Sequence, residues 1–119
     1  IIEYLNFSAE KLKDGGLFFG VTGSENLHQV DKKWACFKVD YPENIKPRSG
    51  AIVKLGLKNP KMVFNDYFWT ESDYRQSFQA SNLQLLKIIY PLGSKTETFK
   101  WKDELKFPPF VIFLARKIK

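Results

Sequence analysis

Residues 17–21 (Leu-Phe-Phe-Gly-Val) form an unbroken apolar run directly after Asp14-Gly15-Gly16. A run without polar alternation is typical of a strand that is buried on both faces of a sheet. Residues 1–13 carry apolar side chains at spacings of three and four, which indicates a helix with one buried face, and the glycines are a helix stop signal. A helix, a glycine stop and a doubly buried strand predict a layered α/β fold.

A second helix has both a start and a stop signal. Thr70 and Asp73 are spaced as a capping box, so the sequence predicts a helix over residues 70–81. Asn82 follows where a left-handed residue commonly ends a helix, and we expect Asn82 to have a positive φ. Residues 83–90 then read as an apolar strand that ends at a proline.

The order of these elements predicts the sheet topology. Residues 17–21, 70–81 and 83–90 form a strand–helix–strand crossover, so the two strands should run nearly parallel and the sheet should contain a parallel pair. Residues 110–114 form a last strand after a non-helical return, and we expect it to be antiparallel to a neighbour. Residues 34–69 hold three strand-like stretches with a Pro- and Asn-containing turn, which predicts a small antiparallel meander.

Composition excludes several classes of protein. The 119 residues are less than one domain of ~150 residues, and the longest apolar run is six residues, whereas a membrane-spanning helix needs ~20. The net charge of +6 weakly favours anionic partners. Cys36 is the only cysteine, which excludes a multi-cysteine metal cluster and predicts a cytoplasmic protein with no metal site. The chain begins at Ile1, and Met62 is its only methionine, so we expect a fragment, a processed product or the ordered part of a longer protein.

Four stretches of the chain, in order, resemble motifs of the class I S-adenosylmethionine-dependent methyltransferases. Residues 12–19 (Leu-Lys-Asp-Gly-Gly-Leu-Phe-Phe) are similar to the family's Leu-Lys-Pro-Gly-Gly turn before its fifth strand, with aspartate in place of proline. Residues 65–74 resemble the aromatic segment that opens the next helix. Residues 78–83 resemble Phe-x-x-Ala-Gly-Phe with asparagine in place of glycine, and residues 108–117 are like the family's final strand.

The resemblance implies an α/β fold, namely the C-terminal part of a doubly wound, Rossmann-like methyltransferase sheet with the meander of residues 34–69 inserted. Residues 1–119 would be one partial domain. The family binds S-adenosylmethionine through a glycine-rich turn after its first strand and an acidic residue after its second, and neither is present in this chain. The cofactor would therefore be bound mainly by an N-terminal half, and no residue of this chain is assigned to it.

The resemblance implies methyl transfer to a small-molecule acceptor, and it directs attention to a few residues. His28 is the only histidine and follows the first strand, where ligands of open α/β sheets bind, so it is the candidate general base; the alternative is an exposed loop histidine. Thr22, Asp66, Tyr67 and Trp69 are the candidate substrate-binding residues, with packing or surface roles as the alternative.

Other functions are open at this point. The acceptor could be RNA or a nucleotide, as in cap-type methyltransferases. The chain could also be a non-enzymatic basic α+β binding module, because Lys32-Lys33-Trp34 and Lys100-Trp101-Lys102 place basic residues beside an aromatic one. The apolar strand at residues 17–21 should pair with a neighbouring strand and have a helix packed on each face. If these are missing, we also expect self-association through an uncovered sheet edge.

Overall fold

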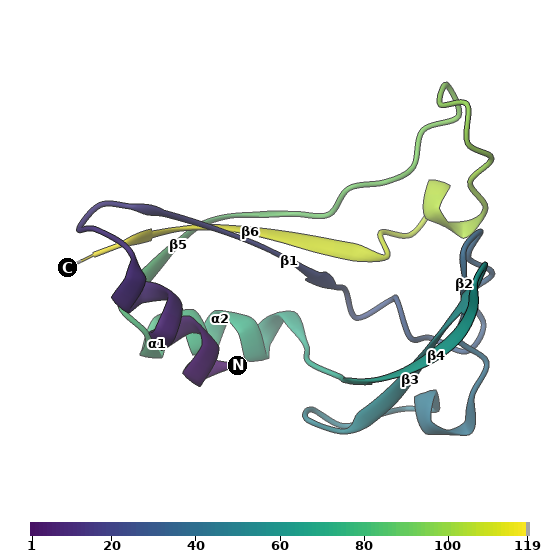
Figure 1. The fold of residues 1–119 in the computed structure, drawn as a ribbon, viewed down its shortest axis with the longest axis horizontal. Helices are drawn as coiled ribbons and strands as arrows, with labels where there is room; N and C mark the ends of the chain where they lie inside the picture. The colour runs from purple at the N-terminus through teal and green to yellow at the C-terminus, as the bar shows by residue number, and fades with distance from the viewer. Residues whose placement is uncertain (119) are drawn as a thin grey trace.

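A computed structural model describes residues 1–118 of the chain. Its helices and strands, in chain order, are α1 (Ile2–Lys11), β1 (Leu17–Gly23), β2 (Phe37–Lys38), η1 (Pro42–Asn44), β3 (Ile52–Lys58), β4 (Lys61–Tyr67), α2 (Glu71–Ala80), β5 (Leu83–Ile89), η2 (Asp103–Leu105) and β6 (Phe110–Lys117). The predicted helices and strands are thus present. The protein is a mixed α/β fold with two sheets (Figure 1).

The first sheet has the strand order β1-β6-β5, and both pairs are antiparallel. Because β1 and β5 are each antiparallel to β6, they run in the same direction, as the crossover predicted. They are not neighbours, however, and within residues 1–118 neither sheet contains a parallel hydrogen-bonded pair, so the predicted parallel pair is wrong. The crossover through α2 places β5 two strand positions away from β1, and β6 lies between them.

Both helices lie on one face of this sheet (Figure 1). The core between helices and sheet is built by buried residues of α1, α2, β5 and β6: Leu5, Ala9, Phe78, Leu83, Val111, Phe113 and Ala115. Phe18 of β1 packs against them. The opposite face is uncovered in the described residues, because Phe19 and Val21 of β1 are 66% and 68% exposed. The prediction that residues 17–21 are buried on both faces is therefore wrong for this part of the chain.

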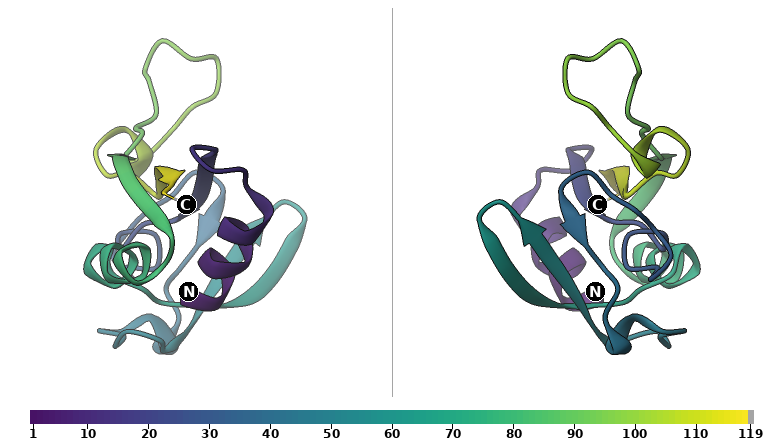
Figure 2. Two further views of the ribbon diagram at one scale, coloured as in Figure 1. Left: turned by 90° about the vertical axis from the view of Figure 1, so that its left-hand side faces the viewer. Right: turned by 90° about the vertical axis from the view of Figure 1, so that its right-hand side faces the viewer.

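The second sheet is the predicted antiparallel meander, with the strand order β2-β3-β4. It lies at the opposite end of the molecule from α1, and Figure 2 shows it from both ends. Strand β2 is only two residues long, and β4 is exposed along its whole length. A small second core joins the meander to the first sheet: Leu27, Trp34 and Val39, with Phe37, Leu55 and Phe110 packed against them.

The sequence prediction for the start of α2 is confirmed, and the prediction for its end is wrong. The capping box is present, since the Asp73 N–H donates to Oγ1 of Thr70 at 3.1 Å and the Thr70 N–H donates to Oδ2 of Asp73 at 2.8 Å. The positive φ expected at Asn82 is wrong, because Lys46 is the only non-glycine residue of the described chain with a positive φ. Instead, Ser81 ends α2 in an extended conformation, and its hydroxyl donates to the carbonyl of Phe78. No helix of the described chain is long and apolar enough to cross a membrane.

Candidate functional site

The loop that follows β1 is held rigidly at the carboxyl end of the strand. The backbone N–H of Ser24 donates to the carbonyl of Pro109 at 2.9 Å, and the Ser24 hydroxyl donates to the carbonyl of Pro108. The Asn26 N–H donates to Oγ of Ser24 at 3.1 Å. These bonds tie the loop to the segment that enters β6, so the positions of the residues that follow are fixed.

His28 is the last residue of this loop turn, and it is buried, with only 4% of its surface exposed. A Cβ built on Gly23 would lie 2.6 Å from Cδ2 of Leu27, so the glycine at the end of β1 makes room for the side chain that precedes His28. Nε2 of His28 has no hydrogen-bond partner and is enclosed by protein. The alternative of an exposed loop histidine is therefore wrong.

Asp66, on β4, faces this buried nitrogen. Its Oδ2 lies 3.6 Å from Nε2 of His28, which is longer than a hydrogen bond and within the range of an ion pair. The imidazole of His28 beside the carboxyl lowers the pKa of Asp66, burial raises it, and a 2.8 Å hydrogen bond from the Tyr67 N–H lowers it further. The net direction is downward, so Asp66 is ionised at neutral pH. Half of its side chain, 51%, is exposed.

Tyr74 and Thr22 form the other side of the site. The hydroxyls of the two residues lie 3.4 Å apart, which joins α2 to the end of β1. Burial raises the pKa of the Tyr74 phenol; the hydrogen bond with Thr22 lowers it, while the negative charges of Asp66 and Asp73 raise it. Tyr74 is therefore a neutral hydroxyl near the Asp66 carboxylate.

A groove of about 370 Å³ runs along β1 between the two helices, and Thr22, Trp69 and Tyr74 line one end of it. Gly50 supports this end, because a Cβ built there would lie 3.3 Å from Cη2 of Trp69. A second cavity, of about 420 Å³, lies on the other side of the loop, where His28 lines it together with Glu25, Gln29, Asn44, Lys46 and Phe68. His28 thus lies beside Asp66 and also lines a separate cavity.

The sequence-predicted residues form two pairs and one outlier. The structure brings His28 to Asp66, and Thr22 to Trp69. Tyr67 does not join them, because strand alternation turns it away from Asp66, and it is 60% exposed. The sequence analysis did not select Tyr74 as a site residue. The signal for it was its place in the first turn after the capping box, on the helix face toward the sheet.

No protein-family model matches the chain, and no curated protein matches it. Among solved structures, the chain is similar to a crystal structure from Listeria monocytogenes, that of a protein whose assignment as an S-adenosylmethionine dependent methyltransferase is provisional. The TM-score is 0.71 at 14% sequence identity, over 100% of this chain and 55% of the Listeria chain. The likeness shows a shared fold, and this chain spans about half the length of that protein.

Proposed function

We propose that this chain is the acceptor-side part of a class I S-adenosylmethionine-dependent methyltransferase that methylates a small molecule. The observation that carries the proposal is the fold likeness over the whole chain, taken together with a polar cluster at the carboxyl end of β1. Ligands of open α/β sheets bind at this end of the strands. The sequence resemblance supports the same activity independently of the fold.

The cluster is suited to hold and orient an acceptor. Thr22 and Tyr74 offer hydroxyls, Trp69 offers an aromatic wall, and Asp66 offers a carboxylate. Because Nε2 of His28 is enclosed by protein, Asp66 is the member of the His28–Asp66 pair that can meet an acceptor directly. A positioned acceptor in a site that excludes water is the main requirement of a group transfer of this kind.

The proposal places the main cofactor site outside the described residues. Strand β1 ends in Gly23 and continues into a hydrogen-bonded loop, whereas a nucleotide site of this type needs a glycine-rich turn that opens a helix. We therefore propose that S-adenosylmethionine is bound mainly by a part of the protein outside this sequence. Strand β1 has a free edge on its side away from β6, and its exposed apolar face fits the addition of further sheet.

The test compares residues 1–119 with the longest natural chain that contains them. Calorimetry with S-adenosylmethionine should show binding to the longer chain and none to residues 1–119. Micromolar binding by residues 1–119 as a monomer would overturn the division of the site. Two other outcomes would overturn the methyltransferase assignment itself. One is a parent reading frame that encodes no strand–turn–helix unit before residue 1. The other is a longer chain that does not bind S-adenosylmethionine.

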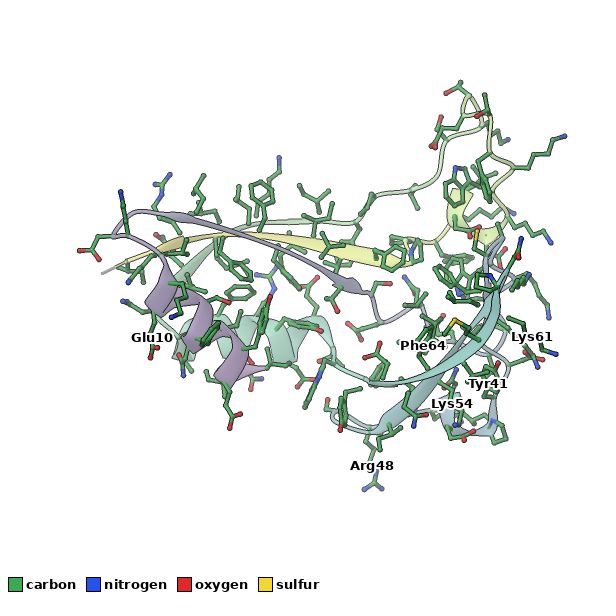
Figure 3. The ribbon with its side chains drawn as sticks, viewed as in Figure 1. Glu10, Tyr41, Arg48, Lys54, Lys61 and Phe64 are labelled. Carbon is green, nitrogen blue, oxygen red and sulfur yellow. The ribbon has the colours of Figure 1, made fainter. Side chains whose placement is uncertain are left out.

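One observation favours a second function, binding of single-stranded nucleic acid as acceptor or partner. The outward face of the meander is basic: Lys54 lies opposite Asn65, Lys58 opposite Lys61, and Lys38 opposite Gly56. Tyr41 lies across Gly56, and Nζ of Lys38 is 4.9 Å from the centre of its ring. Figure 3 shows Tyr41, Lys54 and Lys61 at one end of the molecule, away from Glu10 on α1, while Arg48 lies at the other end of the meander. Basic residues around an aromatic ring are the composition of a single-strand platform.

A charge-reversal experiment separates the two functions. The double variant Lys54→Glu, Lys61→Glu removes charge from the meander, and Lys11→Glu, Lys87→Glu removes the same charge from α1 and β5. If the meander binds nucleic acid, only the first variant should weaken binding of a short oligouridine, and the slope of log K against log salt should fall by about 1 or more. Equal effects of the two variants contradict this second function.

A further inference from the structure

The second cavity, of about 420 Å³ beside His28, is separate from the groove along β1, and the proposed function does not use it. It lies between the loop that follows β1 and the segment of η1, and most of its wall is apolar: Val30, Ile45, Pro47 and Phe68. A largely apolar cavity of this size that also holds a few polar groups is typical of a small-molecule site.

Three polar side chains of this wall already have partners within the protein. Asn44 uses both its Nδ2 hydrogens and its Oδ1 in hydrogen bonds with backbone groups. Glu25 accepts a 2.9 Å hydrogen bond from the backbone N–H of Glu71, and Asp31 lies 3.2 Å from Nζ of Lys32. These side chains are therefore held in place without a ligand.

His28 differs from them, because it is buried and has no hydrogen-bond partner. Only 4% of the residue is exposed. Neither ring nitrogen forms a hydrogen bond within residues 1–118, and of the two only Nε2 is enclosed by protein. Since His28 lines the second cavity, Nδ1 is the nitrogen that a molecule in this cavity can reach. A single polar group in an apolar wall fixes the orientation of a ligand.

Asp66 determines the hydrogen-bonding role of Nδ1. Oδ2 of Asp66 lies 3.6 Å from Nε2 of His28, and an ionised carboxylate can only accept hydrogen bonds. In a neutral imidazole, one nitrogen carries the proton and the other has a lone pair. The proton is favoured on Nε2, beside the carboxylate, so Nδ1 presents its lone pair to the cavity. A ligand must therefore donate a hydrogen bond to it.

The charges around the cavity favour a neutral ligand. Lys32 compensates Asp31, which leaves one negative charge at Glu25 and one positive charge at Lys46. Neither sign predominates, and the apolar wall disfavours any charged group because that group would lose its water. Lys46 is also the only non-glycine residue of the described chain with a positive φ, +44°. Backbone strain of this kind is concentrated at binding sites.

We propose that the second cavity binds a small, neutral aromatic molecule that carries a hydroxyl or N–H group. Its ring would lie against Phe68, and its donor would bond to Nδ1 of His28. Asp66 is a positioning residue, which holds the proton of the imidazole on Nε2. The site is independent of the proposed function, because no step of methyl transfer enters it.

The experiment uses the full natural chain and two probes of similar shape. Phenol can donate a hydrogen bond, and anisole cannot. Binding is followed by the 15N signals of the His28 ring, assigned with His28→Gln, at about pH 8, above the ordinary pKa of histidine. We expect phenol to bind about fivefold or more tightly than anisole, which is the effect of one buried hydrogen bond left unmade. Phenol should move the Nδ1 signal more than the Nε2 signal.

Three outcomes would overturn the proposed site. They are equal binding of phenol and anisole, tighter binding of benzoate than of phenol, and no binding of either neutral probe at millimolar concentration. The first would show that Nδ1 does not select a donor. The second would show that the cavity prefers an anion.

A matched pair of variants locates the binding. Ile45 lines the cavity and is 61% exposed, so Ile45→Trp can fill the space without disturbing a core, and it should abolish phenol binding. Ile52, on β3, is 53% exposed and does not line the cavity, so Ile52→Trp should leave phenol binding unchanged. Equal effects of the two variants would place the phenol elsewhere.

Asp66→Asn tests the positioning role. Before any probe is added, we expect the unmodified protein to show a protonated Nε2 and an unprotonated Nδ1. An asparagine side chain donates as well as accepts, so Asp66→Asn should mix the two tautomers and reduce the preference for phenol. Asp14→Asn, in the turn at the other end of β1, should change neither. An unchanged tautomer in Asp66→Asn would overturn the role of Asp66.

Discussion

The hydroxyl of Ser49 donates a 2.6 Å hydrogen bond to Oδ2 of Asp73, which joins the loop before β3 to the first turn of α2. The same carboxylate accepts from the Thr70 N–H in the capping box. Asp73→Ala should therefore lower the free energy of unfolding by about 1 kcal/mol or more, and Ser49→Ala by less. Chemical denaturation of both single variants and the double variant measures the coupling. Additive losses would show that the loop and the helix are not joined through this bond.

The same carboxylate predicts a pH dependence. The hydroxyl of Ser49, followed by the Thr70 N–H, lowers the pKa of Asp73 below its ordinary value of 3.8. A carboxyl with a lower pKa in the folded state stabilises the protein above the unfolded pKa, and this contribution disappears as the pH falls through the folded pKa. The stability difference between the unmodified protein and Asp73→Asn should thus be present at pH 6 and shrink below about pH 4. A constant difference over this range would contradict the assignment.

Substitutions at Gly15 and at Asn82 test which of the two residues has a left-handed backbone conformation. Gly15 has φ +76°, and nothing lies within 4 Å of a Cβ built on it, so Gly15→Ala changes backbone strain and little else. We expect it to cost about 1 kcal/mol of stability. Asn82 is exposed and has no positive φ, so Asn82→Ala should change stability by less than about 0.5 kcal/mol. A larger loss at Asn82 than at Gly15 would restore the helix ending that the sequence suggested.

The uncovered face of β1 predicts self-association of residues 1–119. Phe19→Ser changes a side chain that is mostly exposed on this face, and Phe64→Ser makes the same change on β4. Sedimentation velocity should show that the isolated chain associates, that Phe19→Ser weakens the association, and that Phe64→Ser leaves it intact. A monomeric unmodified chain would argue against the role of β1.

Local signals in the sequence predicted the local structure. The Thr70–Asp73 spacing fixed the start of α2, and the alternating strands around the turn at residues 59–60 fixed the meander. These features depend on neighbours in sequence, which a single chain displays directly. The prediction for Asn82 failed because Ser81 closes the helix with its own hydroxyl, an alternative that the residue type alone does not reveal.

Long-range relationships could not be predicted in the same way. The position of β6 between β1 and β5 depends on how a long irregular connection, residues 90–109, returns to the sheet. The contact of His28 with Asp66 joins two segments that are far apart in sequence, and it depends on the loop bonds at Ser24 and on the space that Gly23 leaves for Leu27, the residue before His28. The sequence analysis selected both His28 and Asp66 as candidate site residues, but no local pattern indicated that they contact each other.

The position of β6 between β1 and β5 also affects how the chain folds during its synthesis. Strand β6 is the last of the described strands to be translated, yet it is the hydrogen-bonding partner of both β1 and β5. A nascent chain that has reached only residue 109 can form its helices and its meander, while β1 and β5 keep unpaired edges. The β1-β6-β5 pairing therefore forms only after residues 110–117 have left the ribosome. A chain stalled before residue 110 should expose its apolar strands and depend on chaperones until translation resumes.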